Sequence, residues 1–536
     1  APVPAPVVEV PPAPTPAPVV EVPPAPAPPA PVAETAPVPV APVAETAPVP
    51  VVETAPPPQT VPTPSADIPP PERELSPSEQ LRISIDTQPG NVSVSSPQNL
   101  ATQSRSSLDT TDVLRGNIAT ALQKGNIDVA VMQIEQLKQQ EYGNYFGQAI
   151  LMNSNAPYSV AEVQKKLQRI SEQTGKKPAI LYVIVQPETL QLVLVMPSGK
   201  PIYRSVPAAN RDTLIKTVTE FRSEITDPAK RDTTSYLESA QKLYQWIIAP
   251  LASELQSQGI QTIAFSLDPK LRSVPLAALH DGQQFLVEKY SIALIPSVNL
   301  IDTRYRDIRK SHVLAMGASQ FPNTNLPSLP AVPIELTTIA NNMWEGKYFL
   351  DRDFTLANLQ SESVRGGFAI IHLATHGSFQ SGEPNQSYIQ LWDSQITLDR
   401  LRQLRWNHTP VELLVLSACR TAFGDEKAEL GFGGLAVASG VKSALASLWY
   451  VSDQGTLGLM TEFYEQLKTA PIKAEALRQA QIAMIRGKVR MEDGKMRGVT
   501  SQEEGITLPP ELASQGDLIP SHPFYWAAFT LIGSPW

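Results

Sequence analysis

Apolar residues in the C-terminal half of the chain form short continuous runs separated by amphipathic segments. Such runs predict strands buried on both faces, which we place over 312–319, 347–351, 368–376, 411–419, 443–451 and 525–533. Helical periodicity falls between them, over 334–344, 355–363, 434–440, 453–468 and 473–486. The alternation predicts an α/β fold with a mostly parallel sheet flanked by helices. The polar stretch over 487–522 is predicted to be a long loop.

The residues before this alternation predict a β-rich and helical lead-in. Two apolar strands, 178–186 and 190–196, are separated by a Pro-Glu-Thr turn signal and should form a hairpin. Helices are expected over 211–224 and 234–257, a strand over 260–267, and a β-rich segment with an Asp281-Gly282 turn over 271–297. Nearer the N-terminus, two helices within 108–147 are separated by Gly125-Asn126, and a third covers 160–173. There is no 34-residue repeat, so a tetratricopeptide array is not supported.

The first 71 residues differ from the rest of the chain. They hold about half of the prolines and no Lys or Arg, and the sequences PAPVVEVPPAP and VAETAPVPV each occur twice. Proline at this density predicts an extended spacer of polyproline-II type. Residues 72–107 are polar and also predicted to be disordered. We therefore expect a Pro/Ala/Val-rich disordered tail and linker (1–107), a short helical region (108–174) and a folded domain (175–536) with its catalytic part at about 312–536.

Composition excludes several classes of function. The formal net charge of −9 argues against a nucleic-acid-binding protein, and a single cysteine excludes an internal disulfide framework or a cysteine-based zinc site. No apolar run is long enough to span a membrane. The chain begins at Ala1. If Ala1 follows a cleaved signal peptide, we expect export to a periplasmic or extracellular location, and otherwise a cytoplasmic one.

The single cysteine lies in a chemically informative place. In a parallel sheet, active sites lie beyond the carboxyl ends of the strands. One predicted strand ends at His376 and another ends at Cys419. If the two strands are neighbours, an imidazole and a thiol meet at one edge, as an activated thiol requires. The alternative is a buried structural cysteine and an unrelated histidine, and strand ends alone leave both open.

The residues around His376 refine this hypothesis. His372 lies within the same apolar run, so we expect it to be a packed core residue able to orient its neighbour, and we prefer His376 as the base. A metal pair of His372 and His376 is weakly supported, because the context is β-rich and carboxylate ligands are missing. Gly377 could present its N–H, with that of Cys419, to an oxyanion. It could also be a glycine in a sharp loop turn, and the two interpretations are compatible.

Three residues are candidates for a substrate pocket. Asp453 and Asp399 are acidic, and either would favour Arg or Lys before the cleaved bond. Asp453 is alternatively the N-cap of the helix that follows it. Trp449 is either a packing residue or a pocket wall.

A glycine-rich run, Gly431-Phe432-Gly433-Gly434, follows the cysteine. It lacks the phosphate-loop pattern, so we predict a mobile loop beside the nucleophile, with Glu429 as a regulatory contact. Long polar segments at 420–433 and 487–522 suggest an enzyme that stays latent until a partner or a cleavage rearranges these loops.

Several motifs together resemble a known family. The segments HLATHGSF, LLVLSACRTAFGD, ELGFGGLAVASGVKSALASLWYVSD, ALRQAQIAM and HPFYWAAFTLIG occur in the order found in the CHAT domain, a caspase-like family common in cyanobacteria and other bacteria. LRSVPLAAL and FLVEKYSIALIPS resemble its upstream half, so the resemblance covers roughly 175–536. The family often has glycine where this chain has Ala422, a minor departure because no catalytic group is lost.

The resemblance implies a caspase–separase type of fold with a His–Cys dyad at His376 and Cys419. The implied activity is that of a cysteine endopeptidase that cleaves protein substrates through a thioester acyl-enzyme and needs no cofactor. Its expected partners are a protein substrate and an activating protein. Two alternatives stay open: a catalytically silent caspase-like scaffold for protein interaction, and a non-proteolytic thiol enzyme such as an acyltransferase.

Overall fold

The computed structural model describes residues 111–147, 159–322, 324–407, 411–421, 425–499, 501–502 and 504–536, with the backbone alone for 418–421. The predicted disordered tail and linker, 1–107, lies outside these residues. The proposed domain boundaries stay predictions.

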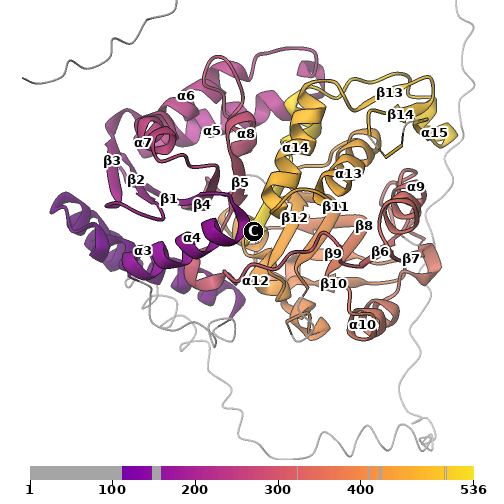
Figure 1. Cartoon of the computed structure of the whole chain (residues 1–536), viewed down its shortest axis with the longest axis horizontal. Coiled ribbons are helices and arrows are strands. Elements are labelled where there is room, and N and C mark those ends of the chain that lie inside the picture. The colour runs from indigo at the N-terminus through magenta and orange to yellow at the C-terminus, as the bar shows by residue number, and fades with distance from the viewer. Residues whose placement is uncertain are drawn as a thin grey trace, which may run out of the picture. The chain divides into compact units, whose positions relative to one another are not determined.

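One mixed sheet organises the described part of the chain. It contains 13 strands, and its main path has the order β10-β9-β8-β11-β12-β16-β5-β4-β1-β2-β3, with β6 pairing β7 and β8. The predicted class, an α/β fold with a mostly parallel sheet flanked by helices, is confirmed. Figure 1 shows α13 (Asp453–Leu467) and α14 (Lys473–Ile485) on one side of β8, β11 and β12, and α12 (Leu435–Ser439) on the other.

The central strands follow from the predicted apolar runs, and all of them except the edge strand Gly346–Leu350 are buried on both faces. They are β6 (Val313–Gly317), β7 (Gly346–Leu350), β8 (Ile370–Phe379), β11 (Leu413–Thr421) and β12 (Ser443–Ser447). β8 runs parallel to β6 and to β11, and β11 runs parallel to β12. α9 (Val332–Thr337), which continues as a π-helical turn over Thr338–Met343, and α10 (Leu356–Arg365) lie between these strands in sequence.

The lead-in belongs to the same sheet. β1 (Pro178–Val185) and β2 (Leu190–Val195) form the predicted hairpin, which β3 (Ile202–Val206) extends. β4 (Thr262–Leu267) lies parallel to β1 and to β5 (Ser291–Leu294), and β5 joins the C-terminal half of the sheet through β16 (Phe529–Gly533). β16 is antiparallel to β12 and follows the short helix α16 (Pro523–Trp526), so the predicted strand 525–533 is too long.

Three other predictions need correction. The expected helix over 234–257 is two helices, α6 (Leu237–Ile247) and α7 (Ala252–Ser257), because Pro250 lies in the 3-10 turn between them. The β-rich segment 271–297 contains the short helix α8 (Leu286–Lys289) and one strand, β5. The long loop 487–522 contains a small antiparallel sheet, β13 (Arg490–Glu492), β14 (Lys495–Arg497) and β15 (Ile506–Thr507), and the helix α15 (Pro510–Ala513).

The N-terminal helices are present as predicted. One helix covers 111–123, and α3 (Ile127–Phe146) follows after Gly125, whose φ of 73° permits the tight reversal. α4 (Val160–Thr174) begins with a capping box between Ser159 and Glu162 and packs against β1 and β2. α5 (Arg211–Thr226) covers the predicted helix 211–224.

Candidate active site

The two strands proposed to carry the dyad are neighbours. In the β8–β11 register, His376 is the partner of Ala418, and Cys419 is the partner of Gly377. The backbones of His376 and Cys419 therefore lie one position apart on adjacent parallel strands. The Cys419 side chain lies outside the described residues, so its role as nucleophile stays a prediction.

A bulge precedes His376. Leu416 pairs with Leu373, but the next described pair is Ala418 with His376, so β8 has one residue more than β11 at this point. Bulges often occur beside active sites, where they change the direction of a side chain. β8 also continues to Phe379, and Gly377 therefore lies within the strand and has a β9 (Tyr388–Gln390) partner as well. The alternative interpretation of Gly377 as a glycine in a sharp loop turn is therefore wrong.

The His376 ring is held in a defined orientation. Its Nε2 lies 2.8 Å from the carbonyl oxygen of Pro327, and its ring lies 4.8 Å from that of Phe321 between centroids. A carbonyl oxygen only accepts hydrogen bonds, so Nε2 carries the proton. In the neutral ring, Nδ1 is then unprotonated and available as a base.

Burial sets the charge of this ring. The His376 side chain is 9% exposed, and this burial lowers the pKa of His376, while the bond to Pro327 opposes the shift. A pKa below the ordinary value of about 6.5 means that the imidazole is mostly neutral at pH 7. The ring is thus in the state that accepts a proton.

Tyr450, which the sequence did not single out, lies beside the histidine. Its ring centroid is 6.1 Å from that of His376, and its hydroxyl donates to Oδ1 of Asp453 at 2.9 Å. Tyr450 is 39% exposed, whereas Asp453 is partly buried. Asp453 and His376 therefore border the same exposed tyrosine ring.

Asp453 is not the cap of α13. Ser452 is the N-cap, and its side chain accepts from the Gly455 N–H. Asp453 instead accepts from Tyr450 and, at 3.5 Å, from the backbone N–H of Ala331. Burial raises the pKa of Asp453, and the nearby Glu335 raises it further. Among the ion pairs of the described residues, none includes Asp453.

The other two pocket candidates lie in different surroundings. Trp449 is buried, donates from its indole to the carbonyl of Phe524, and faces the Arg222 guanidinium at 5.5 Å. These contacts are typical of a packing residue. Asp399 is exposed in the 3-10 segment Leu398–Leu404.

His372 is a core residue, as predicted. Its side chain is fully buried, Nδ1 lies 3.2 Å from the Tyr464 hydroxyl, and Nε2 lies 3.2 Å from Oε1 of Glu335. Its partners come from α13 and α9, so it joins β8 to the helices on one face of the sheet. No contact between His372 and His376 appears among the described residues.

The predicted mobile loops are largely ordered elements. The helix α11 (Glu426–Gly433) begins at the N-cap Asp425, and Gly431, Phe432 and Gly433 form its last turn. Glu429 is buried, and the Ser273 hydroxyl donates to it at 2.6 Å. Burial raises the pKa of Glu429. Residues 422–424 lie outside the description.

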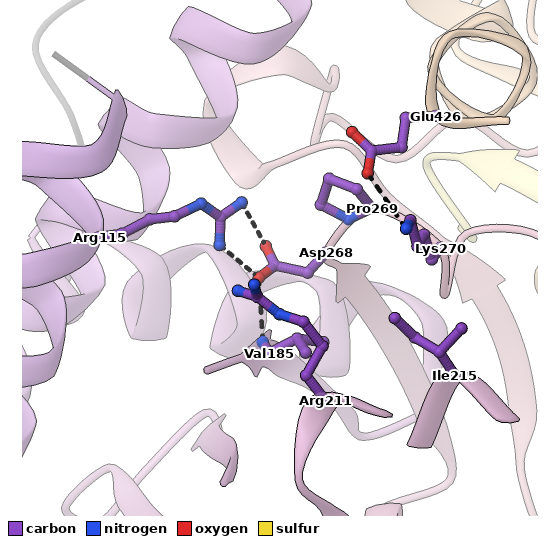
Figure 2. A pocket seen from close by; sticks show the side chains of 8 residues that line it. All are labelled: Arg115, Val185, Arg211, Ile215, Asp268, Pro269, Lys270 and Glu426. Atoms are coloured by element: carbon purple, nitrogen blue, oxygen red, sulfur yellow. Dashed lines mark hydrogen bonds and ion pairs between the residues drawn. The ribbon is translucent and has the colours of Figure 1, made fainter. Parts of the chain in front are cut away.

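A small cavity lies on another part of the molecule. It has a volume of about 210 Å³ and is lined by residues that include Arg115, Arg211, Asp268, Lys270 and Glu426. Figure 2 shows Arg115 and the Val185 amide converging on the Asp268 carboxylate, with Lys270 opposite Glu426. His376 and Asp453 do not line this cavity.

The described ranges lack both a metal-binding cluster and a membrane-spanning helix. There, no cluster of three or more His, Cys, Asp or Glu residues is arranged to hold a metal ion. Every helix of the same ranges is too short or too polar to cross a membrane.

Solved structures of two known proteins are similar to the chain. The chain is similar to the separase of Saccharomyces cerevisiae in its complex with securin, with a TM-score of 0.43 at 10% identity, over 76% of this chain and 34% of that one. A second structure of this complex gives 0.41 at the same identity and coverage. The complex of the pro- and mature domains of Porphyromonas gingivalis RgpB gives 0.34 at 12% identity, over 60% of this chain and 76% of that one. The chain thus spans about a third of the separase chain.

No curated protein sequence matches the chain. The suggested cyanobacterial origin stays a prediction. The family model of the CHAT domain matches residues 237–534, more than half of the chain. This protein therefore belongs to the CHAT domain family.

Proposed function

We propose that this protein is a cysteine endopeptidase with His376 as general base and Cys419 as nucleophile. Nδ1 of His376 takes the thiol proton, and the thiolate attacks the carbonyl carbon of a peptide bond. The imidazolium then gives the proton to the leaving amine, and a thioester remains on Cys419. Water, activated by the same imidazole, hydrolyses the thioester and frees the thiol.

The observation that carries this proposal is the pairing of β8 with β11. It brings the backbones of His376 and of the single cysteine of the chain to adjacent positions near the carboxyl ends of two parallel strands. The Pro327 carbonyl leaves Nδ1 of His376 free for a proton. Membership of a caspase-like family supports the same assignment.

The oxyanion would be stabilised by backbone N–H groups of Gly377 and Cys419. These residues are register partners, so their amides belong to neighbouring strands at the proposed cleft. Since Gly377 also pairs with β9, its N–H must be turned toward the cleft when substrate binds.

The substrate class follows from Asp453. A partly buried carboxylate with no cationic partner among the described ion pairs suits a substrate side chain that carries positive charge. Its hydrogen bond to Tyr450, whose ring centroid is 6.1 Å from that of His376, supports a pocket near the proposed base. We therefore propose Arg or Lys before the cleaved bond, in a protein substrate. We also propose that the enzyme is latent until a protein partner activates it.

Peptide cleavage by the wild-type chain and by its Cys419→Ala and His376→Ala variants tests this function. The substrates form a peptide library in which every residue type occurs before the cleaved bond. The wild type should cleave after Arg or Lys, and both variants should lose this cleavage. No cleavage, together with unchanged folding in all three proteins, would favour the silent scaffold. Transfer of a small acyl group to Cys419 without peptide cleavage would favour an acyltransferase.

A further inference from the structure

The glycine-rich run after the nucleophile strand lies against the C-terminal end of α3. A methyl group added to Gly434 would lie 2.4 Å from Cε2 of Phe146, and one added to Gly433 would lie 3.0 Å from the Tyr142 hydroxyl. At both distances a neighbouring atom has to move. The missing side chains therefore allow the aromatic end of α3, defined as Tyr142, Tyr145 and Phe146, to approach α11 and α12 closely.

Gly431 is enclosed from two sides. A methyl group there would lie 3.2 Å from the Tyr145 hydroxyl and 3.6 Å from Cδ1 of Phe379. Phe379 is the last residue of β8, three positions after His376. The last turn of α11 thus separates α3 from the strand that carries the proposed base.

Phe432 completes this contact. Its ring meets Phe379 edge-on, with centroids 5.5 Å apart, and α11 packs against β8, β11 and α3. α11 also follows β11 in the chain after only a few residues, so its position constrains the end of the strand that carries Cys419. One short helix therefore contacts both strands of the proposed dyad.

A buried ionic cluster anchors the N-terminal helices near this contact. Asp268 accepts from Arg115 at 2.6 Å and from Lys138 at 2.6 Å, and Glu141 pairs with Arg115 at 2.9 Å and also with Arg272 (Figure 2 shows the Arg115–Asp268 pair). The Arg272 guanidinium lies over the Tyr142 ring at 5.3 Å. The cluster ties the helix 111–123 and α3 to the segment after β4, so the aromatic end of α3 is held from two directions.

We propose that Tyr142, Tyr145 and Phe146 are positioning residues for the dyad. They hold α11 against β8 and β11, and α11 in turn fixes the strand ends at His376 and Cys419. The inference rests on the proposed function, whose regulation it concerns. It makes the N-terminal helices part of the catalytic unit, because whatever moves the C-terminal end of α3 also moves α11.

Full-length variants test this role. Phe146→Ala removes the ring, and Gly434→Ala inserts a methyl group against it. The double variant Gly434→Ala/Phe146→Ala relieves the contact with the ring, while the methyl group stays 3.0 Å from the Leu430 carbonyl oxygen. The matched control is Leu167→Ala, which truncates a buried side chain of α4, a helix that packs on β1 and β2. The first measurement is amide hydrogen exchange of peptides within 413–433, and the second is the pH profile of Cys419 alkylation.

We expect Phe146→Ala and Gly434→Ala to accelerate exchange within 413–433 by roughly tenfold, since each loosens a local packing contact. The double variant should exchange more slowly than Gly434→Ala, and Leu167→Ala should leave 413–433 unchanged. In Phe146→Ala and Gly434→Ala, the apparent pKa of the Cys419 thiol should rise toward its free value. It should rise less in the double variant than in Gly434→Ala, and it should not change in Leu167→Ala.

Two results would overturn the inference. The first is an exchange rate within 413–433 that equals the wild-type rate in both Phe146→Ala and Gly434→Ala. The second is an acceleration in Leu167→Ala as large as that in these two variants. The exchange measurement does not depend on activity. If the wild-type thiol shows no dependence on His376, the proposed function fails, while the exchange data still decide whether the aromatic end of α3 holds α11.

Discussion

His376 owes its proposed role to residues that are distant from it in sequence. The Pro327 carbonyl fixes the tautomer, Phe321 packs on the ring, and Tyr450 connects it to Asp453. The sequence indicated the histidine, because it lies at the end of an apolar run. It gave no sign of Pro327 or Tyr450, because a hydrogen bond across 49 positions leaves no local pattern.

Replacement of Asp453 by asparagine should change specificity. Asp453→Asn keeps the shape of the side chain and removes its charge, so kcat/KM for peptides with Arg or Lys should fall by at least about 100-fold, the scale of a desolvated charge pair. Peptides with an uncharged residue at that position should lose much less. Steady-state kinetics on the two peptide classes measures the difference.

The matched control is Asp399→Asn, the same chemical change at an exposed acidic residue. It should leave both peptide classes within about twofold of wild type. If Asp399→Asn abolished cleavage after Arg while Asp453→Asn did not, the pocket assignment would be reversed.

Tyr450→Phe should alter the pH dependence of cleavage. The hydroxyl of Tyr450 stabilises the Asp453 carboxylate and so lowers its pKa against the effect of burial. Without the hydroxyl, the pKa of Asp453 rises, and a higher pH is needed to ionise it. The acid limb of kcat/KM for Arg peptides should therefore move to higher pH. The pH profile of Cys419 alkylation by neutral iodoacetamide should stay in place, and a parallel shift of both profiles would contradict this explanation.

Among the elements, strands with two buried faces were the most predictable. β6, β8 and β11 follow from apolar runs. The parallel pairing of β6 with β8 follows from α9 and α10 between them, whereas β8 and β11 are joined through β9, β10 (Gln395–Thr397) and 3-10 segments. The bulge in β8 was not predictable, because the extra residue continues the apolar run without a turn signal.

Short strands within polar sequence were missed. β13 and β14 each bury one methionine, Met491 and Met496, between charged residues, and strands of three residues show too little alternation to be recognised. The glycine-rich run was predicted to be a mobile loop because glycine usually marks turns. In this fold, glycine instead makes room for the rings of α3.

Asp268→Asn should weaken the packing of the N-terminal helices on the sheet. The carboxylate is buried and holds Arg115, Lys138 and the Val185 amide, so its neutralisation leaves Glu141 as the one carboxylate that pairs with both cations among the described residues. Breaking a buried pair in this way costs about 3–5 kcal/mol, which urea unfolding can measure. Asp307→Asn, at an exposed pair with Arg309, should cost less than about 1 kcal/mol. Equal effects of the two variants would contradict the structural role of the cluster.

For the molecule as a whole, the same cluster predicts how stability changes in acid. The two cations Lys138 and Arg115 overcome the desolvation penalty and hold the pKa of Asp268 well below its ordinary value. An Asp with a depressed folded-state pKa contributes stability that is complete above its unfolded pKa of about 3.9 and is lost as pH falls toward the folded value. The free energy of unfolding should therefore fall from about pH 4 to pH 2, and this slope should be shallower in Asp268→Asn. Identical slopes in the two proteins would exclude this contribution.

Whether the molecule acts as a thiol enzyme depends on one pair of residues. The most direct measurement is the rate of Cys419 alkylation by iodoacetamide against pH, in the wild type and in His376→Ala. We predict fast alkylation in the wild type, with an apparent thiol pKa below the free value of about 8.5, and loss of this activation in His376→Ala. Slow alkylation that is indifferent to His376 would contradict an imidazole-activated nucleophile.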